Sequence, residues 1–184
     1  MLPLLRSELF KLSHRMMTRV LLLIAVGALL GAYLLLGLVG ESEEGDVLED
    51  LRIGAVHDNG MFMVYQVGVI LTVTLAASTI ASEFSWGTIR TLLPRTAGRS
   101  SLLTAKLITL GLFVVMAVVL GFVAALAGSA LVTAFNDLDS SLGDNFVGRL
   151  LGSMVRTAYV IVPYATLAFV IALWSRSSAA GIAI

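Results

Sequence analysis

One polar segment, Ser82–Lys106, holds the residues whose types and spacing could do chemistry, and it separates two strongly apolar runs. Its basic residues are Arg90, Arg95, Arg99 and Lys106, against a single acidic residue, Glu83. A basic segment between two membrane-spanning helices belongs on the cytoplasmic side of the membrane. The chemistry that these residues offer is therefore charged binding at that surface.

The segment also has a regular internal pattern. Trp86, Ile89 and Leu93 stand at i, i+3 and i+7, which places them on one face of a short helix. The residues that fall off this face are polar: Thr88, Arg90 and Thr91. Ser85 is placed to cap the start of the helix, and Pro94 ends it, because the residue before a proline resists the α conformation. The pattern predicts a short amphipathic helix that lies flat on the membrane surface.

Two interpretations of this helix stay open from its residues alone. In the first it is an interfacial anchor, with Trp86 among the lipid headgroups and the arginines near anionic lipid. In the second it is a docking element for a soluble partner. Gly87 favours the second slightly, because a residue without a side chain lets another backbone come close.

The order of residues along the segment is more specific than its charge. Glu83 closes the second apolar run, and Gly87-Thr88 and the Leu92-Leu93 pair follow it. The entry to the next apolar run reads Arg99, Leu102-Leu103 and Lys106. This order resembles the first cytoplasmic loop of type-2 ABC transporter permeases, the export-type membrane subunits of ABC transporters. The proline of the turn, Pro94, stands two places earlier than in the usual pattern of that family.

The resemblance implies that the short helix is a coupling helix, which docks into a groove of a separate ATP-binding subunit. The residues expected to make this contact are Glu83, Phe84, Trp86, Gly87, Thr88, Arg90 and Thr91. In this interpretation Glu83 and Arg90 fix the helix in the groove, and Gly87 allows close contact. The resemblance also implies a second permease subunit, as a homodimer or with a similar chain, and ATP with Mg²⁺ bound on the partner ATPase and not on this chain.

The composition excludes a soluble globular chain. Hydrophobic residues make up 58% of the sequence and charged residues 13%, whereas soluble domains carry about 25% charged residues. The mean hydropathy is +0.97. The chain has no cysteine, which excludes a disulfide framework, a thiolate metal site and a cysteine nucleophile. These values predict an all-α integral membrane protein.

Four apolar runs are long enough to cross a bilayer, which needs about 20 residues per helix. They cover residues 20–39, 61–82, 107–135 and 157–174. The third exceeds the length that a bilayer needs, so it must tilt, extend past the headgroups or bend. The chain is thus expected to be a single permease transmembrane domain over 1–184, with 83–106 as the cytoplasmic coupling loop and 40–60 and 136–153 as extracellular loops. Members of the resembled family have six spans, so the new apolar run near the end predicts the start of a fifth helix in a truncated chain.

The N-terminal part carries two further features. Residues 4–19 place leucines and basic residues at helical spacing, which predicts an amphipathic in-plane helix on the cytoplasmic face, as the elbow helix of the resembled family. Gly27 and Gly31 form a GxxxG motif in the first apolar run, which favours a close helix contact. Because such motifs also occur by chance in apolar helices, an ordinary lipid-facing helix stays an alternative.

Residues 40–60 form an acidic segment that could be taken for a metal site. The candidate ligands are Asp46, Glu49, Asp50 and His57. Their spacing matches no rigid set of metal ligands, so no metal is expected. A solvated acidic loop with a short helix near residues 46–53 is the favoured interpretation.

Several kinds of chemistry are absent from the sequence. No ionisable residue lies deep in the four expected spans, where ion-coupled transporters keep their relay groups. This argues against a transporter driven by protons or sodium and against a membrane-embedded enzyme. The sequence also lacks a GxxxxGK phosphate-binding loop. If the chain moves a solute against a gradient, another subunit must supply the energy.

The sequence therefore predicts the membrane subunit of an ABC exporter in a bacterial or archaeal cell membrane. We expect a multi-pass chain with a cytoplasmic N-terminus, no catalytic residues and no nucleic-acid partner. Uncharged spans favour an apolar or amphiphilic cargo. The alternative is a non-transport multi-span scaffold or assembly subunit, which explains the spans but not the ordered polar segment.

Overall fold

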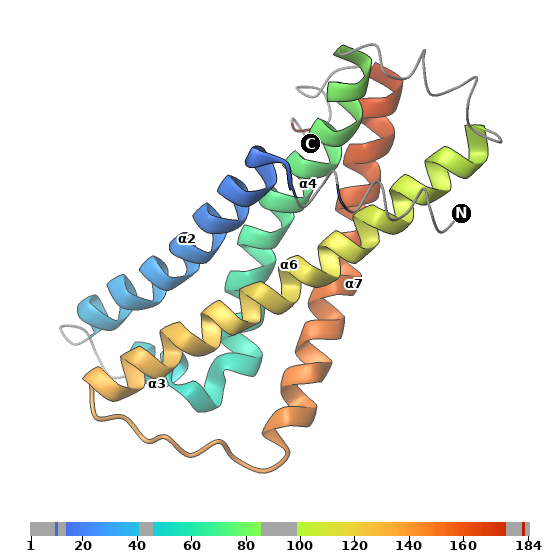
Figure 1. The fold of residues 1–184 in the computed structure, drawn as a ribbon. Coiled ribbons are helices and arrows are strands. Elements are labelled where there is room, and N and C mark those ends of the chain that lie inside the picture. Colours follow the sequence, from blue (N-terminus) through green and yellow to red (C-terminus); the bar gives the residue numbers. More distant parts are fainter. Residues whose placement is uncertain (1–9, 11–13, 41–45, 86–98, 176–181, 183–184) are drawn as a thin grey trace. The chain divides into compact units, whose positions relative to one another are not determined.

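The computed structural model describes residues 10, 14–40, 46–85, 99–175 and 182 (Figure 1). Over these residues the regular structure is entirely helical. The long helices are α2 (Met16–Gly40), α4 (Met61–Ser85), α6 (Arg99–Phe135) and α7 (Phe146–Ser175). Three short elements stand between α2 and α4: the α-helix α3 (Asp46–Leu51), the 3₁₀-helix η1 (Ile53–Ala55) and the π-helix η2 (Val56–Gly60).

All four long helices are long and apolar enough to cross a membrane, which confirms the prediction of four helices able to span one. The short helix expected near residues 46–53 corresponds to α3. Most of the expected in-plane helix over 4–19 lies outside the described residues, as do residues 86–98 of the expected coupling loop and nearly all of the expected fifth helix.

The long helices extend beyond the apolar runs that the sequence marks as spans. Helix α6 begins at Arg99 and not near residue 107, and α7 begins at Phe146 and not near residue 157. A charged residue ends a run of hydropathy, but it does not end a helix, because lysine and arginine are good helix formers. As a result Lys106 and Arg149 lie inside helices and not in the connecting segments where the sequence places them.

The described chain forms two compact units, and every long helix contributes to both. The first unit comprises Met1–Leu22, Val69–Val115 and Ile161–Ile184. Its buried residues include an unusual share of alanine: Ala76, Ala77, Ala105, Ala165, Ala168 and Ala172. Small residues let helix backbones approach closely in a membrane, where van der Waals packing and not water exclusion holds helices together.

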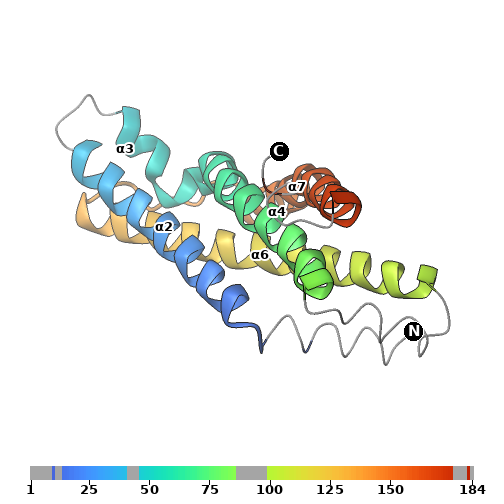
Figure 2. The same ribbon diagram turned by 90° about the horizontal axis from the view of Figure 1, so that it is seen from above.

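The second unit comprises Leu23–Gly68 and Met116–Val160. Within it, the second half of α2 runs beside the second half of α6 in both views (Figure 1, Figure 2). Tyr33 of α2 is 1% exposed and packs against Gly128 of α6, where an added Cβ would lie 2.8 Å from the Tyr33 Cβ. Gly121 of α6 meets Val64 of α4 in the same way, at 2.7 Å. The glycines of α6 therefore set the separation of three helices in this unit.

Candidate functional site

The connection that leads into α4 departs from a regular α-helix. The 3₁₀-helix η1 passes into the π-helix η2, which continues without a break into α4. Val56, His57 and Gly60 of η2 are buried. Single π turns are rare and occur often at functional sites, because the extra residue redirects side chains that a regular α-helix would place elsewhere.

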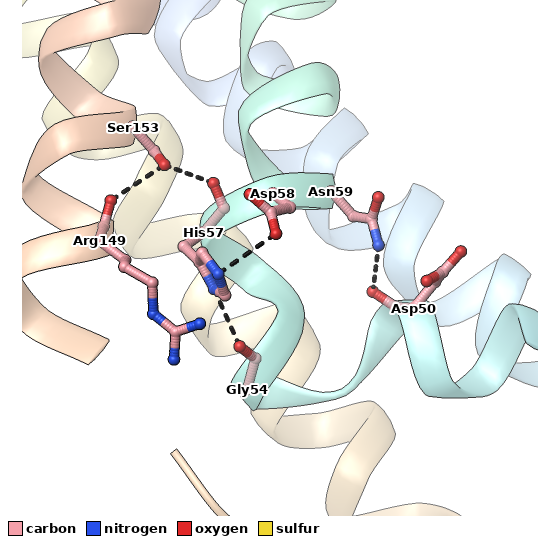
Figure 3. A network of polar contacts seen from close by, with 7 residues as sticks. All are labelled: Asp50, Gly54, His57, Asp58, Asn59, Arg149 and Ser153. Atoms are coloured by element: carbon pink, nitrogen blue, oxygen red, sulfur yellow. Dashed lines mark hydrogen bonds and ion pairs between the residues drawn. The ribbon is translucent and has the colours of Figure 1, made fainter. Parts of the chain in front are cut away.

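His57 lies at the centre of this connection (Figure 3). Its Nδ1 is 3.0 Å from the backbone oxygen of Gly54, and its Nε2 is 3.2 Å from Oδ2 of Asp58. The ring of Phe146 meets the imidazole edge-on, with centroids 6.4 Å apart. A neutral imidazole carries one N–H and can donate to only one of the two oxygens, whereas the protonated ring donates to both. The site is built to orient an imidazole, not to present it to solvent.

Three further hydrogen bonds attach the connection to its neighbours. The hydroxyl of Ser153 on α7 donates to the backbone oxygen of His57 at 2.5 Å and also lies 3.0 Å from the backbone oxygen of Arg149 (Figure 3). The backbone N–H of Ile53 donates to Oγ1 of Thr133 on α6 at 3.0 Å. The Asn59 amide donates to the backbone oxygen of Asp50 on α3 at 3.0 Å (Figure 3). The entry to α4 is thus tied to α3, α6 and α7 within one unit.

The loop between α6 and α7 closes against the same connection. A Cβ on Gly54 would lie 2.7 Å from the backbone oxygen of Ser141, so only glycine fits there. Ser141 in turn donates two hydrogen bonds to Asp139, from its hydroxyl at 2.7 Å and from its backbone N–H at 3.0 Å. These bonds lower the pKa of the Asp139 carboxyl, and the positive charge of Arg52 acts in the same direction.

The expectation that residues 40–60 form a solvated loop is wrong for the part nearest α4. The acidic side chains of Glu49, Asp50 and Asp58 are exposed, but Leu51 and Val56 are 3% and 1% exposed. Because acidic residues dominate the composition of the segment, the sequence gives little sign of the apolar face that packs inward. No group of three or more histidine or acidic residues in the described chain is placed to hold a metal ion.

The structure describes only some of the residues that are predicted to bind a partner. Glu83 and Phe84 belong to the last turn of α4, which ends at Ser85. Trp86, Gly87, Thr88, Arg90 and Thr91 lie outside the described residues. Gly27 and Gly31 lie on α2, and a Cβ added to either would meet nothing within 4 Å. Their shared face is therefore not used for packing between the described parts of this chain.

Sequence reasoning missed Ser153 and Thr133, which make two of the ties to the α4 connection. Each lies in an apolar helix, where a lone hydroxyl residue commonly bonds to its own helix backbone. Ser153 and His57 are 96 positions apart, and Thr133 and Ile53 are 80 positions apart. No periodicity within either helix marks such a long-range pair.

Replacing Ser153 with alanine is expected to lower the free energy of unfolding by about 1–3 kcal/mol, because the buried backbone oxygen of His57 loses its donor from α7. Denaturant unfolding in detergent micelles, followed by circular dichroism, measures the change. Thr74→Ala is the control, because the exposed Thr74 hydroxyl bonds only to Ile70 of its own helix. A loss of equal size in both variants would contradict a tie between the two helices.

Comparison with known proteins assigns a family but adds no function. The model of the family described as "Protein of unknown function (DUF2705)" matches residues 16–184, which include all four long helices and the connections between them. No curated protein and no solved structure matches the chain.

Proposed function

The chain belongs to the family described as "Protein of unknown function (DUF2705)", and we propose from its residues that it is the membrane subunit of an ABC exporter. The observation that carries the proposal is the ordered polar segment from Glu83 to Lys106, with Gly87-Thr88 and the leucine pairs in the order typical of type-2 permeases. Helix α4 ends at Ser85 and α6 begins at Arg99, so the middle of this segment connects two long apolar helices, which supports the proposal.

The charges of the long helices also support an external energy source. The charged residues in these helices are Arg19, Glu83, Arg99, Lys106, Arg149 and Arg156. None of them lies at the middle of its helix: Arg156, which comes nearest to it, is the eleventh of the 30 residues of α7. A proton- or sodium-driven transporter keeps ionisable groups near the middle of the membrane. The energy for transport then comes from ATP and Mg²⁺ on a partner ATPase, and this chain itself is not an enzyme.

The subunits would assemble as a pair of permease chains, identical or similar, above two ATP-binding subunits. The open face of Gly27 and Gly31 on α2 supports a second chain at that position, since small residues at this spacing allow close helix approach. The coupling helix, Phe84–Leu93, would transmit closure of the ATPases into α4 and α6. Lipid surrounds the pair in a bacterial or archaeal cell membrane, and the cargo is apolar or amphiphilic.

The proposed orientation places the N-terminus and residues 86–98 in the cytoplasm and the α6–α7 loop outside, because lysine and arginine are retained on the cytoplasmic side. The absence of natural cysteines makes this testable with single substitutions. A membrane-impermeant maleimide added to intact cells is expected to label Ser140→Cys and not Thr96→Cys, whereas both react after the membrane is opened. Labelling of Thr96→Cys alone in intact cells would reverse the orientation.

The experiment that tests the function is isolation of the tagged chain from its native membrane in mild detergent. We expect a soluble ATPase to be recovered with it, and the complex to hydrolyse ATP. Recovery of the chain alone, or only with other membrane proteins, would favour the alternative of a non-transport scaffold. That alternative accounts for the four helices but gives no role to the ordered segment after α4.

A further inference from the structure

The first half of α7 has two chemically different faces within the second unit. Ser153 and Thr157 are buried on one face, at i and i+4. The adjacent face carries Arg149, Gly152, Arg156 and Tyr159, which follow one another at spacings of three, four and three residues and are all exposed. A Cβ added to Gly152 would meet nothing within 4 Å. The two arginines therefore project from a face that the described chain leaves uncovered, which we call the arginine face.

Neither arginine is neutralised by the described part of the protein. No described carboxylate lies within ion-pair distance of the Arg149 or Arg156 guanidinium. The first turn of α7 contains no acidic residue, so the positive end of the helix dipole adds to the charge of Arg149. The Arg149 guanidinium approaches the backbone of Gly143, since its Nη2 lies 2.9 Å from where a Cβ on that glycine would stand. A left-handed backbone at Gly143, with φ of +62°, allows this fit.

The surroundings of the arginine face are apolar. Val155 is 71% exposed and Tyr159 is 79% exposed, next to Arg156 on the helix. A ligand for this surface must therefore offer an anionic group to the arginines and hydrocarbon to the neighbouring side chains. A free phosphate ion satisfies only the first requirement, and an uncharged lipid only the second.

The length of α7 places the arginines at the depth where such a ligand is found. A helix of 30 residues is about 45 Å long at its usual rise, roughly 15 Å more than the hydrocarbon core of a bilayer. Arg149 and Arg156 are the fourth and eleventh residues of the helix and lie within about 15 Å of its start, so the excess length and the reach of an arginine side chain bring them to the headgroups. At the centre of the bilayer an exposed arginine would be strongly disfavoured.

We propose that the arginine face is a binding site for an anionic phospholipid, with the guanidinium groups of Arg149 and Arg156 on its phosphate and Val155 and Tyr159 against its acyl chains. Arginine suits this role because its planar donors match phosphate oxygens in pairs. The site does not depend on ATP-driven transport and would be present in a scaffold protein as well.

The test is native mass spectrometry of the purified chain with phosphatidylglycerol or phosphatidylcholine of the same acyl chains. The wild type is expected to bind phosphatidylglycerol more tightly, and the R149Q/R156Q double variant to lose about 30-fold in affinity for it, at roughly fivefold for each arginine near the headgroups. Binding of phosphatidylcholine should not change. High salt should reduce the preference of the wild type, and inorganic phosphate at the same concentration as the lipid should not compete.

Matched variants separate lipid recognition from folding. Val155→Gln adds a polar group to the same face without removing a charge and is expected to keep the preference for phosphatidylglycerol, as is the charge-conserving R149K/R156K double variant. Equal binding of the two lipids by the wild type would overturn the proposal. So would an unchanged preference in R149Q/R156Q, or a finding that this variant only dissociates a dimer, which would assign the arginine face to a second copy of the chain.

Discussion

An Arg90→Glu variant is expected to lose roughly 100-fold or more in affinity for the co-purifying ATPase, because reversing a charge at a complementary interface costs several kcal/mol. The amount of the chain in the membrane should stay the same, since Arg90 lies outside the four apolar runs of the sequence. Capture of the ATPase by tagged wild type and variant, at equal amounts of membrane protein, measures the effect. This result would identify the segment after α4 as a docking element.

Arg95→Glu is the matched control for this variant, because it reverses the same charge in the same segment but lies beyond Pro94, where the predicted helix ends. We expect Arg95→Glu to keep most of the ATPase. If both variants lose the ATPase and both are depleted from the membrane, the positive charge of the segment serves insertion and the docking role is wrong. If neither loses it, the short helix is an interfacial anchor.

Replacing Gly128 with alanine is expected to destabilise the protein by roughly 3 kcal/mol, at the upper end of the cost of overfilling a packed interior. The new Cβ would lie 2.8 Å from the Cβ of Tyr33 and 2.9 Å from its Cγ. Tyr33 is 1% exposed, and these atoms stand next to the α2 backbone, so they cannot turn aside as the end of a flexible side chain would. Denaturant unfolding in detergent measures the change.

The same substitution on the same helix at Gly111 is expected to have the opposite sign. A Cβ at Gly111 meets nothing within 4 Å. Alanine there should stabilise the protein by up to about 1 kcal/mol, because glycine in a helix loses more conformational freedom on folding. If Gly128→Ala were as stabilising as Gly111→Ala, the close packing of α2 on α6 would be incorrect.

The spanning helices could be predicted from the sequence because a membrane imposes a local rule. Each backbone group in hydrocarbon must be hydrogen-bonded within its own helix, so a long apolar run is itself sufficient evidence for a helix. The helix ends were harder to predict. Lys106 and Arg149 interrupt the hydropathy of α6 and α7, but the backbone hydrogen bonds continue through them.

The interpretation of the acidic segment before α4 shows where composition misleads. Its charges predict exposure, and Asp58 is indeed 77% exposed at its side chain. The neighbouring His57 is buried, with both ring nitrogens facing oxygen atoms and its backbone oxygen bonded to Ser153. A sequence shows which residues are polar, but it does not show which distant residue will form a hydrogen bond with each of them.

The sequence by itself determined that this protein is helical, that it has four helices able to cross a membrane, and that a basic segment with a regular pattern of residue types follows the second of them. These properties depend on composition and on spacings of a few residues. Only the tertiary structure decided that Tyr33 packs against Gly128, that Ser153 bonds to the entry of α4, and that the described chain leaves the face shared by Arg149 and Arg156 uncovered. Each of these depends on which helix faces stand opposite one another, and close packing between helices settles that only when the chain is folded.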